Sequence, residues 1–133
     1  MADIRRITDH FWAAPQLSPS DLAEIARQGA VLIINNRPEG ESPDQPPGAE
    51  IEEAARAAGL DYAAVPITGR PTPDQVQAVA VLLEGAEGPV LGFCRTGTRS
   101  TMAWAGVQIA AGRHRDAVLA EAAQCGYDLS AVL

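Results

Sequence analysis

The stretch that decides the fold and the chemistry of this chain is Pro89-Val-Leu-Gly-Phe-Cys94-Arg-Thr-Gly-Thr-Arg99-Ser-Thr101. An apolar strand runs into a cysteine, turn-forming and basic residues follow, and an Ala-rich helix begins. A loop that enters a helix N-terminus directs several backbone N–H groups at one point, where the helix dipole adds positive potential. Such a ring of amides binds an anion and also stabilises a thiolate, the nucleophilic form of cysteine. The stretch therefore predicts a cysteine nucleophile beside a site for an anionic substrate.

Length and composition limit the class of protein. With 133 residues, 47% of them hydrophobic, the chain is expected to fold as one domain over residues 1–133. The formal net charge of −7 argues against a nucleic-acid or anionic-membrane partner. The first ten residues carry charges where a signal peptide would need an apolar run, and no stretch has the length of a membrane span. We therefore expect a cytoplasmic protein that acts on a small anionic substrate.

The cysteines and histidines indicate free thiols and no metal. Cys94 and Cys125 suit a reducing compartment in which thiols stay free. Together with His10 and His114 they show no zinc-ligand spacing, so the sequence predicts neither a metal nor another cofactor. Cys125 has no basic neighbour, which favours a role in core packing, with a resolving thiol for Cys94 as the alternative.

Helix signals alternate with short apolar runs along the chain. The expected helices begin near Ser18, Ile51, Thr72, residue 99 and residue 115, from their capping residues or apolar spacing. Buried parallel strands are predicted from runs that are apolar on both faces, at Val31–Ile34, Tyr62–Val65 and Val90–Phe93. Residues 3–13 are expected to add one or two edge strands. This alternation predicts an α/β fold, a mainly parallel sheet of four to five strands flanked by helices.

Three irregular loops leave the carboxyl ends of predicted strands. They are the proline-rich segment 37–48, the segment 67–71 and the loop that follows Cys94. In open parallel sheets these strand ends meet at the ligand crevice. We therefore expect the three loops to gather around Cys94.

Two arginines close to Cys94 are candidate substrate ligands. The planar guanidinium of Arg99, at the start of the helix, suits an oxyanion, and Arg95 is expected to help orient it. Ser100 is expected to donate a hydrogen bond to the sulfur, and Gly97 to supply the positive φ that a closed ring of amides needs. The alternative is a buried structural cysteine with two solvated arginines.

The other two loops each contribute one basic candidate. Arg37 is expected to help bind substrate or to orient the neighbouring loops, with hydrogen bonding inside its own loop as the alternative. Arg70 is a candidate cation at the rim of the site, with a solvated surface arginine as the alternative.

Three motifs carry a resemblance to known proteins. Cys-Arg-Thr-Gly-Thr-Arg-Ser over 94–100 resembles the active loop of single-domain rhodaneses. Almost the whole chain is similar to the bacterial β-lactamase-hydrolase-like phosphatase-type domains, including Ile-Asn-Asn-Arg-Pro-Glu-Gly-Glu over 34–41 and Cys-Gly-Tyr-Asp-Leu-Ser over 125–130. The resemblance implies the fold of cysteine-dependent dual-specificity phosphatases and an activity of phosphatase or sulfurtransferase. It also implies a nucleophilic Cys94, an anion-binding Arg99 and a cradle of backbone amides over 95–100, Thr96, Gly97 and Thr98 included.

Two departures from phosphatases of this fold favour sulfur transfer. Four residues separate Cys94 from Arg99 where those phosphatases have five, and a tighter ring suits a persulfide or thiosulfate that approaches end-on. Cleavage of a phosphomonoester leaves an alkoxide that needs a general acid, yet the loop 66–73 has no acid before Asp74. Sulfite, the leaving group of thiosulfate, needs none. Glu41 or Asp44 from the long loop remains available as an acid.

The sequence thus leads to one main hypothesis and two alternatives. The main hypothesis is a rhodanese-like sulfurtransferase, in which a Cys94 persulfide carries sulfane sulfur from thiosulfate or a persulfide to a thiol or cyanide. The first alternative is a phosphatase that hydrolyses phosphotyrosine or a small aryl phosphate through a Cys94 phosphoenzyme. The second is an anion-binding module without catalytic activity.

Overall fold

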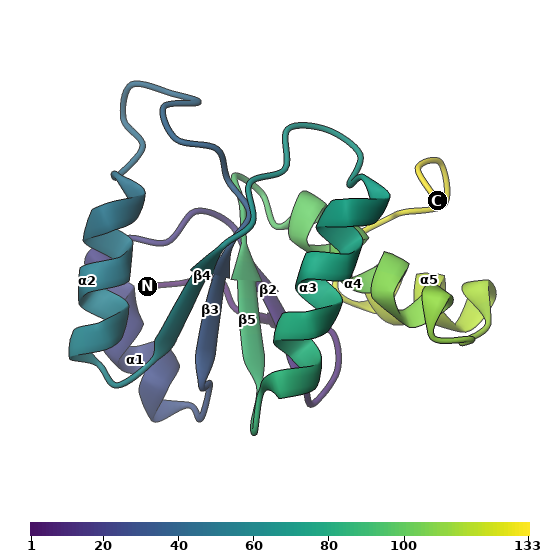
Figure 1. The fold of residues 1–133 in the computed structure, drawn as a ribbon, viewed down its shortest axis with the longest axis horizontal. Helices are drawn as coiled ribbons and strands as arrows, with labels where there is room; N and C mark the ends of the chain where they lie inside the picture. Colours follow the sequence, from purple (N-terminus) through teal and green to yellow (C-terminus); the bar gives the residue numbers. More distant parts are fainter.

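The computed structural model describes residues 1–133 and contains one five-stranded sheet with helices on both faces (Figure 1). The strands are β1 (Arg5–Arg6), β2 (Phe11–Ala14), β3 (Leu32–Asn35), β4 (Asp61–Ala64) and β5 (Val90–Phe93). The helices are α1 (Leu22–Arg27), α2 (Gly48–Ala57), α3 (Pro73–Gly85), α4 (Thr98–Ala110) and α5 (Arg115–Gln124), with a 3₁₀ turn at Pro19–Asp21.

The strand order is β1-β2-β5-β3-β4. Strand β1 is antiparallel to β2, and every other neighbouring pair is parallel. Helices α1 and α2 cover one face of the sheet, and α3, α4 and α5 cover the other (Figure 1). This arrangement confirms the predicted α/β fold with a mainly parallel sheet.

Two strands differ from their prediction. Residues 3–13 were expected to form only edge strands, but β2 lies inside the sheet between β1 and β5, and its four residues are all buried. The run Tyr62–Val65 was expected to be buried on both faces, but β4 is an edge strand with Asp61 and Ala64 exposed. The local sequence gives apolar character but not the number of neighbouring strands, which the chain topology decides.

The helix starts follow the capping signals of the sequence. At the start of α3 the Thr72 hydroxyl accepts a hydrogen bond from the backbone N–H of Gln75 at 3.2 Å, and the Gln75 side chain accepts one from the N–H of Thr72 at 2.9 Å. This reciprocal pair is a capping box, which satisfies two backbone donors that the first turn leaves unpaired.

A glycine in β5 brings α4 close to the sheet. A Cβ atom at Gly92 would lie 3.2 Å from Cβ of Ser100 and 3.1 Å from the ring of Phe11. On the same side of the sheet, the ring of Phe11 stacks on that of Trp104 with centroids 6.0 Å apart. The N-terminus of α4 is therefore held directly above the carboxyl end of β5.

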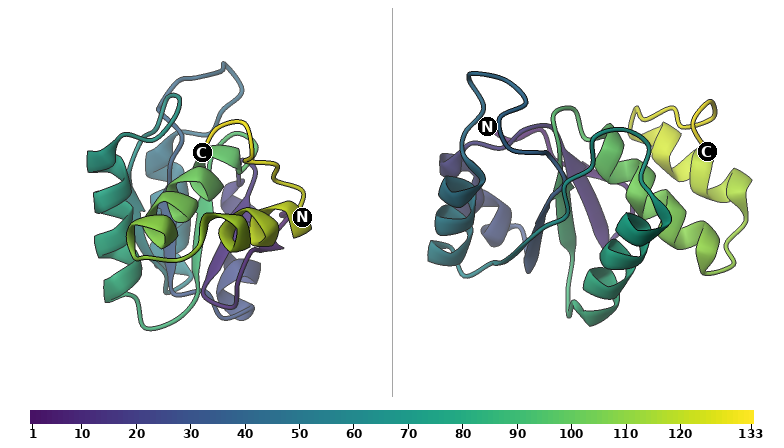
Figure 2. Two further views of the ribbon diagram at one scale, coloured as in Figure 1. Left: turned by 90° about the vertical axis from the view of Figure 1, so that its right-hand side faces the viewer. Right: turned by 45° about the horizontal axis from the view of Figure 1, so that its top comes forward.

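The loops that follow β3, β4 and β5 all project from the same end of the sheet, where these strands finish, at the top of Figure 1. The C-terminal tail after α5 returns to the same end of the molecule, beside the start of α4 (Figure 2). No helix here has both the length and the apolar character that crossing a bilayer requires.

Candidate active site

Cys94 lies immediately after β5, with its sulfur inside the turn that leads into α4. The backbone N–H of Gly97 donates to its Sγ at 3.1 Å. Gly97 is the N-cap of α4 and has a φ of 94°, the left-handed conformation that glycine adopts at low cost. The turn thus directs at least one main-chain N–H at the sulfur, in the way predicted for a loop that binds anions or a thiolate. Cys94 is fully buried in this conformation.

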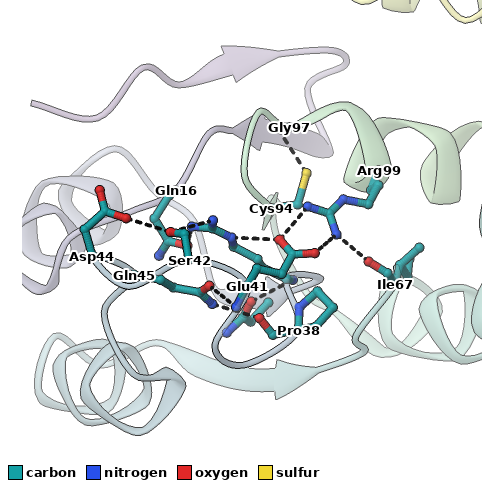
Figure 3. A network of polar contacts seen from close by, with 12 residues as sticks. Gln16, Pro38, Glu41, Ser42, Asp44, Gln45, Ile67, Cys94, Gly97 and Arg99 are labelled. Carbon is teal, nitrogen blue, oxygen red and sulfur yellow. Dashed lines mark hydrogen bonds and ion pairs between the residues drawn. The ribbon is translucent and has the colours of Figure 1, made fainter. Parts of the chain in front are cut away.

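Arg99 connects all three loops (Figure 3). Its Nη1 and Nη2 donate to the two carboxylate oxygens of Glu41 at 2.6 and 2.9 Å, and Nη1 also donates to the carbonyl of Ile67 at 2.7 Å. Glu41 belongs to the loop after β3 and Ile67 to the loop after β4. The prediction that these loops gather around Cys94 is therefore confirmed.

Glu41 is held between two arginines. Its Oε1 also accepts a hydrogen bond from Nε of Arg37 at 3.0 Å. The hydrogen bond from Arg99 is the main cause that lowers the pKa of Glu41, and the hydrogen bond from Arg37 adds to it. Partial burial opposes them, and the resulting pKa is about 2. The hydrogen bond with Glu41 in turn raises the pKa of Arg99. Glu41 is therefore a carboxylate at neutral pH.

Arg37 serves the long loop itself. Its side chain is only 5% exposed and donates to Glu41, to Oε1 of Gln16 at 3.0 Å and to Oγ of Ser42 at 3.3 Å. Glu41 and Ser42 belong to the same loop as Arg37, whereas Gln16 follows β2, so Arg37 joins its loop to that segment. The expected contact of Arg37 with substrate stays a prediction.

Ser100 has a different partner from the predicted one. Its hydroxyl donates to Oδ1 of Asn36 at 2.7 Å and not to the sulfur of Cys94. The reason is geometric: Ser100 lies in the first turn of α4, where it is buried against β5 and faces the end of β3.

Asn36 is a structural residue of the site that the sequence did not single out. Its backbone N–H donates to the carbonyl of Phe93 at 2.8 Å, and its side-chain amide donates to the carbonyl of Val65 at 2.9 Å. The backbone carbonyl of Asn36 accepts a hydrogen bond from the N–H of Ile67 at 2.9 Å. The side-chain oxygen of Asn36 also accepts the hydrogen bond from Ser100. Through these four hydrogen bonds, the buried Asn36 joins the ends of β3, β4 and β5. The sequence signal that could have identified Asn36 is its position directly after a predicted strand, next to a second asparagine, Asn35.

The family of the Beta-lactamase hydrolase-like protein, phosphatase-like domain, matches residues 3–111, which include Cys94, Arg99 and both loops that reach Arg99. The chain belongs to this family. The fold is accordingly that of the cysteine-dependent, dual-specificity-like phosphatases, as the resemblance implied.

Relatives and solved structures agree with this assignment. A Beta-lactamase hydrolase-like protein of Xylella fastidiosa is 38% identical over 125 residues, which are 92% of this chain and 29% of the relative. The chain thus spans less than a third of that relative's length. A candidate phosphatase of Neisseria meningitidis (nma1982) superimposes with a TM-score of 0.87 at 34% identity, covering 96% of this chain and 92% of the other. A cysteine-to-serine variant of P. aeruginosa TpbA in complex with pTyr superimposes with a TM-score of 0.66 at 18% identity, covering 90% and 70%.

These comparisons correct the weight given to the activities. The family is described as phosphatase-like and the Neisseria meningitidis structure as a candidate phosphatase, and neither supports the sulfurtransferase reading. The spacing between Cys94 and Arg99 is compatible with membership of a phosphatase-like family, so it does not by itself indicate sulfur transfer. The alternative hypothesis of the sequence therefore has the better support.

The remaining predicted side-chain ligands lie on two loops, with Arg95, Thr96 and Thr98 near the turn after Cys94 and Arg70 in the loop after β4. The side chain of Arg95 is exposed and has no hydrogen bond or ion pair within the chain, and the same holds for Arg70. Thr96 donates from its hydroxyl to that of Thr98 at 3.0 Å.

The two acids of the long loop, Glu41 and Asp44, are carboxylates at neutral pH. Glu41 is ionised, and hydrogen bonds led by that from Ser42 lower the pKa of Asp44 as well. Asp74 lies exposed in the first turn of α3. A cavity of about 870 Å³ lies at the opposite end of β5, beside Val90 and Trp104, away from Cys94.

Proposed function

We propose that this domain is a cysteine-dependent phosphatase that hydrolyses aryl phosphate monoesters, with phosphotyrosine as the model substrate. The observation that carries the proposal is the hydrogen bond from Gly97 N–H to Sγ of Cys94, one turn before Arg99. Membership of the phosphatase-like family supports it. The pTyr complex of TpbA, a protein that shares the fold, supports the substrate class.

The reaction takes two displacements at phosphorus. The Cys94 thiolate attacks the phosphorus, an S–P bond forms, and the P–O bond to the aryl group breaks with release of the phenolate. Water then attacks the same phosphorus, the S–P bond breaks, and inorganic phosphate leaves with the thiolate restored. The amides of the turn stabilise the charge that develops on the phosphoryl oxygens in both steps.

Arg99 retains a free edge for the substrate. Of the five N–H donors of an arginine, Glu41 takes one on each terminal nitrogen, and the carbonyl of Ile67 takes the second on Nη1. The N–H of Nε and the second N–H of Nη2 remain, and these lie on one edge of the guanidinium. That edge suits two phosphoryl oxygens at once. Glu41 would therefore orient Arg99 for the substrate.

The state of the carboxylates supports aryl esters over alkyl esters. An alkoxide leaving group needs a proton in the transition state, and Glu41 is ionised between its two arginines. A phenolate is a much better leaving group and departs with less help. The domain is thus suited to phenol esters of phosphate.

Sulfur transfer is the second candidate because sulfite, its leaving group, needs no general acid, and Glu41 beside Arg99 is ionised. In that reaction the thiolate would attack the outer sulfur of thiosulfate, the S–S bond would break and sulfite would leave. A thiol or cyanide would then take the sulfur from the persulfide.

Parallel assays with wild type, Cys94→Ser and Cys125→Ser separate these functions. We expect hydrolysis of p-nitrophenyl phosphate and phosphotyrosine by wild type and Cys125→Ser, no turnover by Cys94→Ser, and no transfer of sulfur from thiosulfate to cyanide. Thiocyanate formation without ester hydrolysis would favour the sulfurtransferase. Neither activity, together with binding of inorganic phosphate in calorimetry, would leave only an anion-binding module.

A further inference from the structure

The peptide unit between Thr96 and Gly97 directs its N–H at the sulfur of Cys94, so its carbonyl points away from the sulfur. Each carbonyl of the turn needs a partner if it is buried. The carbonyl of Arg95 accepts from the backbone N–H of Gln16 at 3.2 Å, and that of Gly97 accepts from the backbone and hydroxyl of Thr101 at 3.0 and 2.8 Å. The carbonyl between them, that of Thr96, has a partner of another kind.

Tyr127, in the C-terminal tail, supplies that partner. Its hydroxyl donates to the carbonyl of Thr96 at 3.1 Å, across 31 residues of sequence. It is the only side chain from outside the turn and α4 that holds a carbonyl of residues 95–97. Tyr127 lies beyond residues 3–111, the part of the chain that the phosphatase-like family matches.

The hydrogen bond of Tyr127 reaches the sulfur through a single peptide unit. The carbonyl of Thr96 and the N–H of Gly97 are the two ends of one peptide group, and that N–H donates to Sγ of Cys94 at 3.1 Å. Hydrogen bonds in a chain polarise one another, so a donor on the carbonyl makes the N–H a stronger donor to the sulfur. The phenol, the 96–97 peptide and the sulfur thus form one continuous chain.

The surroundings of Tyr127 keep its hydroxyl in place and protonated. The residue is only 4% exposed, and the guanidinium of Arg5 lies 5.0 Å from its ring centroid. Arg5 also donates to the carbonyl of Cys125 at 3.1 Å, which fixes the start of the tail. Burial raises the pKa of Tyr127, so the phenol remains a donor throughout the neutral range.

The turn and Tyr127 also fit each other sterically. A Cβ atom at Gly97 would collide with the hydroxyl of Tyr127. The phenol therefore occupies the space beside Gly97 that any larger residue would need. Packing and hydrogen bonding act on the same peptide unit.

We propose that Tyr127 is a positioning residue that stabilises the Cys94 thiolate through the peptide unit between Thr96 and Gly97. The proposal rests on the proposed function, since it needs Cys94 as the nucleophile. Tyr127 does not touch the substrate. Its loss should therefore lower kcat and leave KM nearly unchanged.

The test follows thiolate formation directly, apart from turnover. In a Cys125→Ser background Cys94 is the only thiol, and its thiolate is followed by ultraviolet absorbance across pH. Tyr127→Phe keeps the ring and removes only the hydroxyl, and we expect about a threefold smaller ratio of thiolate to thiol at the wild-type midpoint. The acid limb of the kcat profile should move to higher pH by about half a unit, which corresponds to the same threefold change. Leu129→Val, in the same apolar cluster as Tyr127, is the control and should leave both curves unchanged.

The outcomes distinguish this inference from the proposed function. If Cys94 in the unaltered background forms thiolate only near the pH of an ordinary cysteine, about 8.5, the Cys94 nucleophile itself is contradicted. If it forms thiolate at lower pH and the Tyr127→Phe curve coincides with it, the role of Tyr127 is overturned while the phosphatase stands. Should Tyr127→Phe fail to fold, wild-type NMR decides. The carbon of Tyr127 that bears the hydroxyl must shift with the Cys94 midpoint, and its failure to do so overturns the inference.

Discussion

At the scale of single residues, the site depends on how charges and main-chain dipoles are paired around one sulfur. Cys94 accepts a hydrogen bond from Gly97 N–H, and Arg99 is fixed by Glu41 on one side. The ion pair joins residues 58 positions apart in sequence. No local pattern announces such a contact, so the sequence could identify Arg99 as an anion-binding residue but not its carboxylate partner.

The two arginines of the turn should respond differently to the same substitution. Arg99→Lys removes the planar edge that can bind two phosphoryl oxygens, and we expect kcat/KM for p-nitrophenyl phosphate to fall about 100-fold or more. Arg95 is exposed and unpaired, so Arg95→Lys should change kcat/KM by less than about threefold. Equal sensitivity at the two positions would contradict the role of Arg99.

The ion pair between Glu41 and Arg99 should make stability depend on pH. Because the pKa of Glu41 falls from 4.5 to about 2 on folding, its stabilisation is complete above pH 4.5 and is lost as the pH falls toward 2. Urea unfolding at pH 7 should show Glu41→Gln less stable than wild type by about 1–2 kcal/mol, a difference that shrinks between pH 4.5 and 2. Glu52→Gln, which loses an exposed pair with Arg56, is the control and should cost about 0.5 kcal/mol or less.

At the scale of secondary-structure elements, α4 lies between two glycines with nearly the same positive φ. Gly97 before the helix has a φ of 94°, and Gly112 after it has a φ of 96°. A Cβ at Gly112 meets nothing within 4 Å, whereas at Gly97 it collides with Tyr127. The two positions therefore separate backbone strain from the shape of the active-site turn.

Alanine at these two glycines should give different losses. Gly112→Ala should destabilise the protein by about 1 kcal/mol, the cost of the left-handed conformation alone, and should keep full activity. Gly97→Ala has the same backbone cost, and its Cβ must also displace Tyr127 or the turn. We therefore expect a larger loss of stability and loss of phosphatase activity. Thermal unfolding and p-nitrophenyl phosphate assays measure both. A fully active Gly97→Ala would show that the turn does not depend on this fit.

Most elements could be predicted from local chemistry, and the exceptions have a common cause. The capping box at Thr72 and Gln75 uses neighbours in sequence, so its signal was complete. The burial of β2 and the exposure of β4 depend on strand order, which local patterns do not contain. The hydrogen bond between Ser100 and Asn36 spans 64 residues and was missed for the same reason.

At the scale of the whole molecule, the fold brings four distant segments to one end of the sheet. The loops after β3, β4 and β5 meet at Arg99, and the C-terminal tail reaches the turn through Tyr127. Parallel strand topology made the meeting of the loops predictable, because the carboxyl ends of parallel strands lie at the same end of the sheet. The return of the tail follows α5 and could not be read from any strand pattern.

Covalent trapping tests the central claim most directly. Wild type and Cys94→Ser are mixed with a large excess of p-nitrophenyl phosphate, quenched in acid within the first turnovers, and analysed by intact mass and peptide mapping. We predict one phosphoryl group on the wild-type peptide that contains Cys94 and none on Cys94→Ser. Turnover of the ester with no phosphoryl adduct at Cys94, or with the adduct on another residue, would contradict the account.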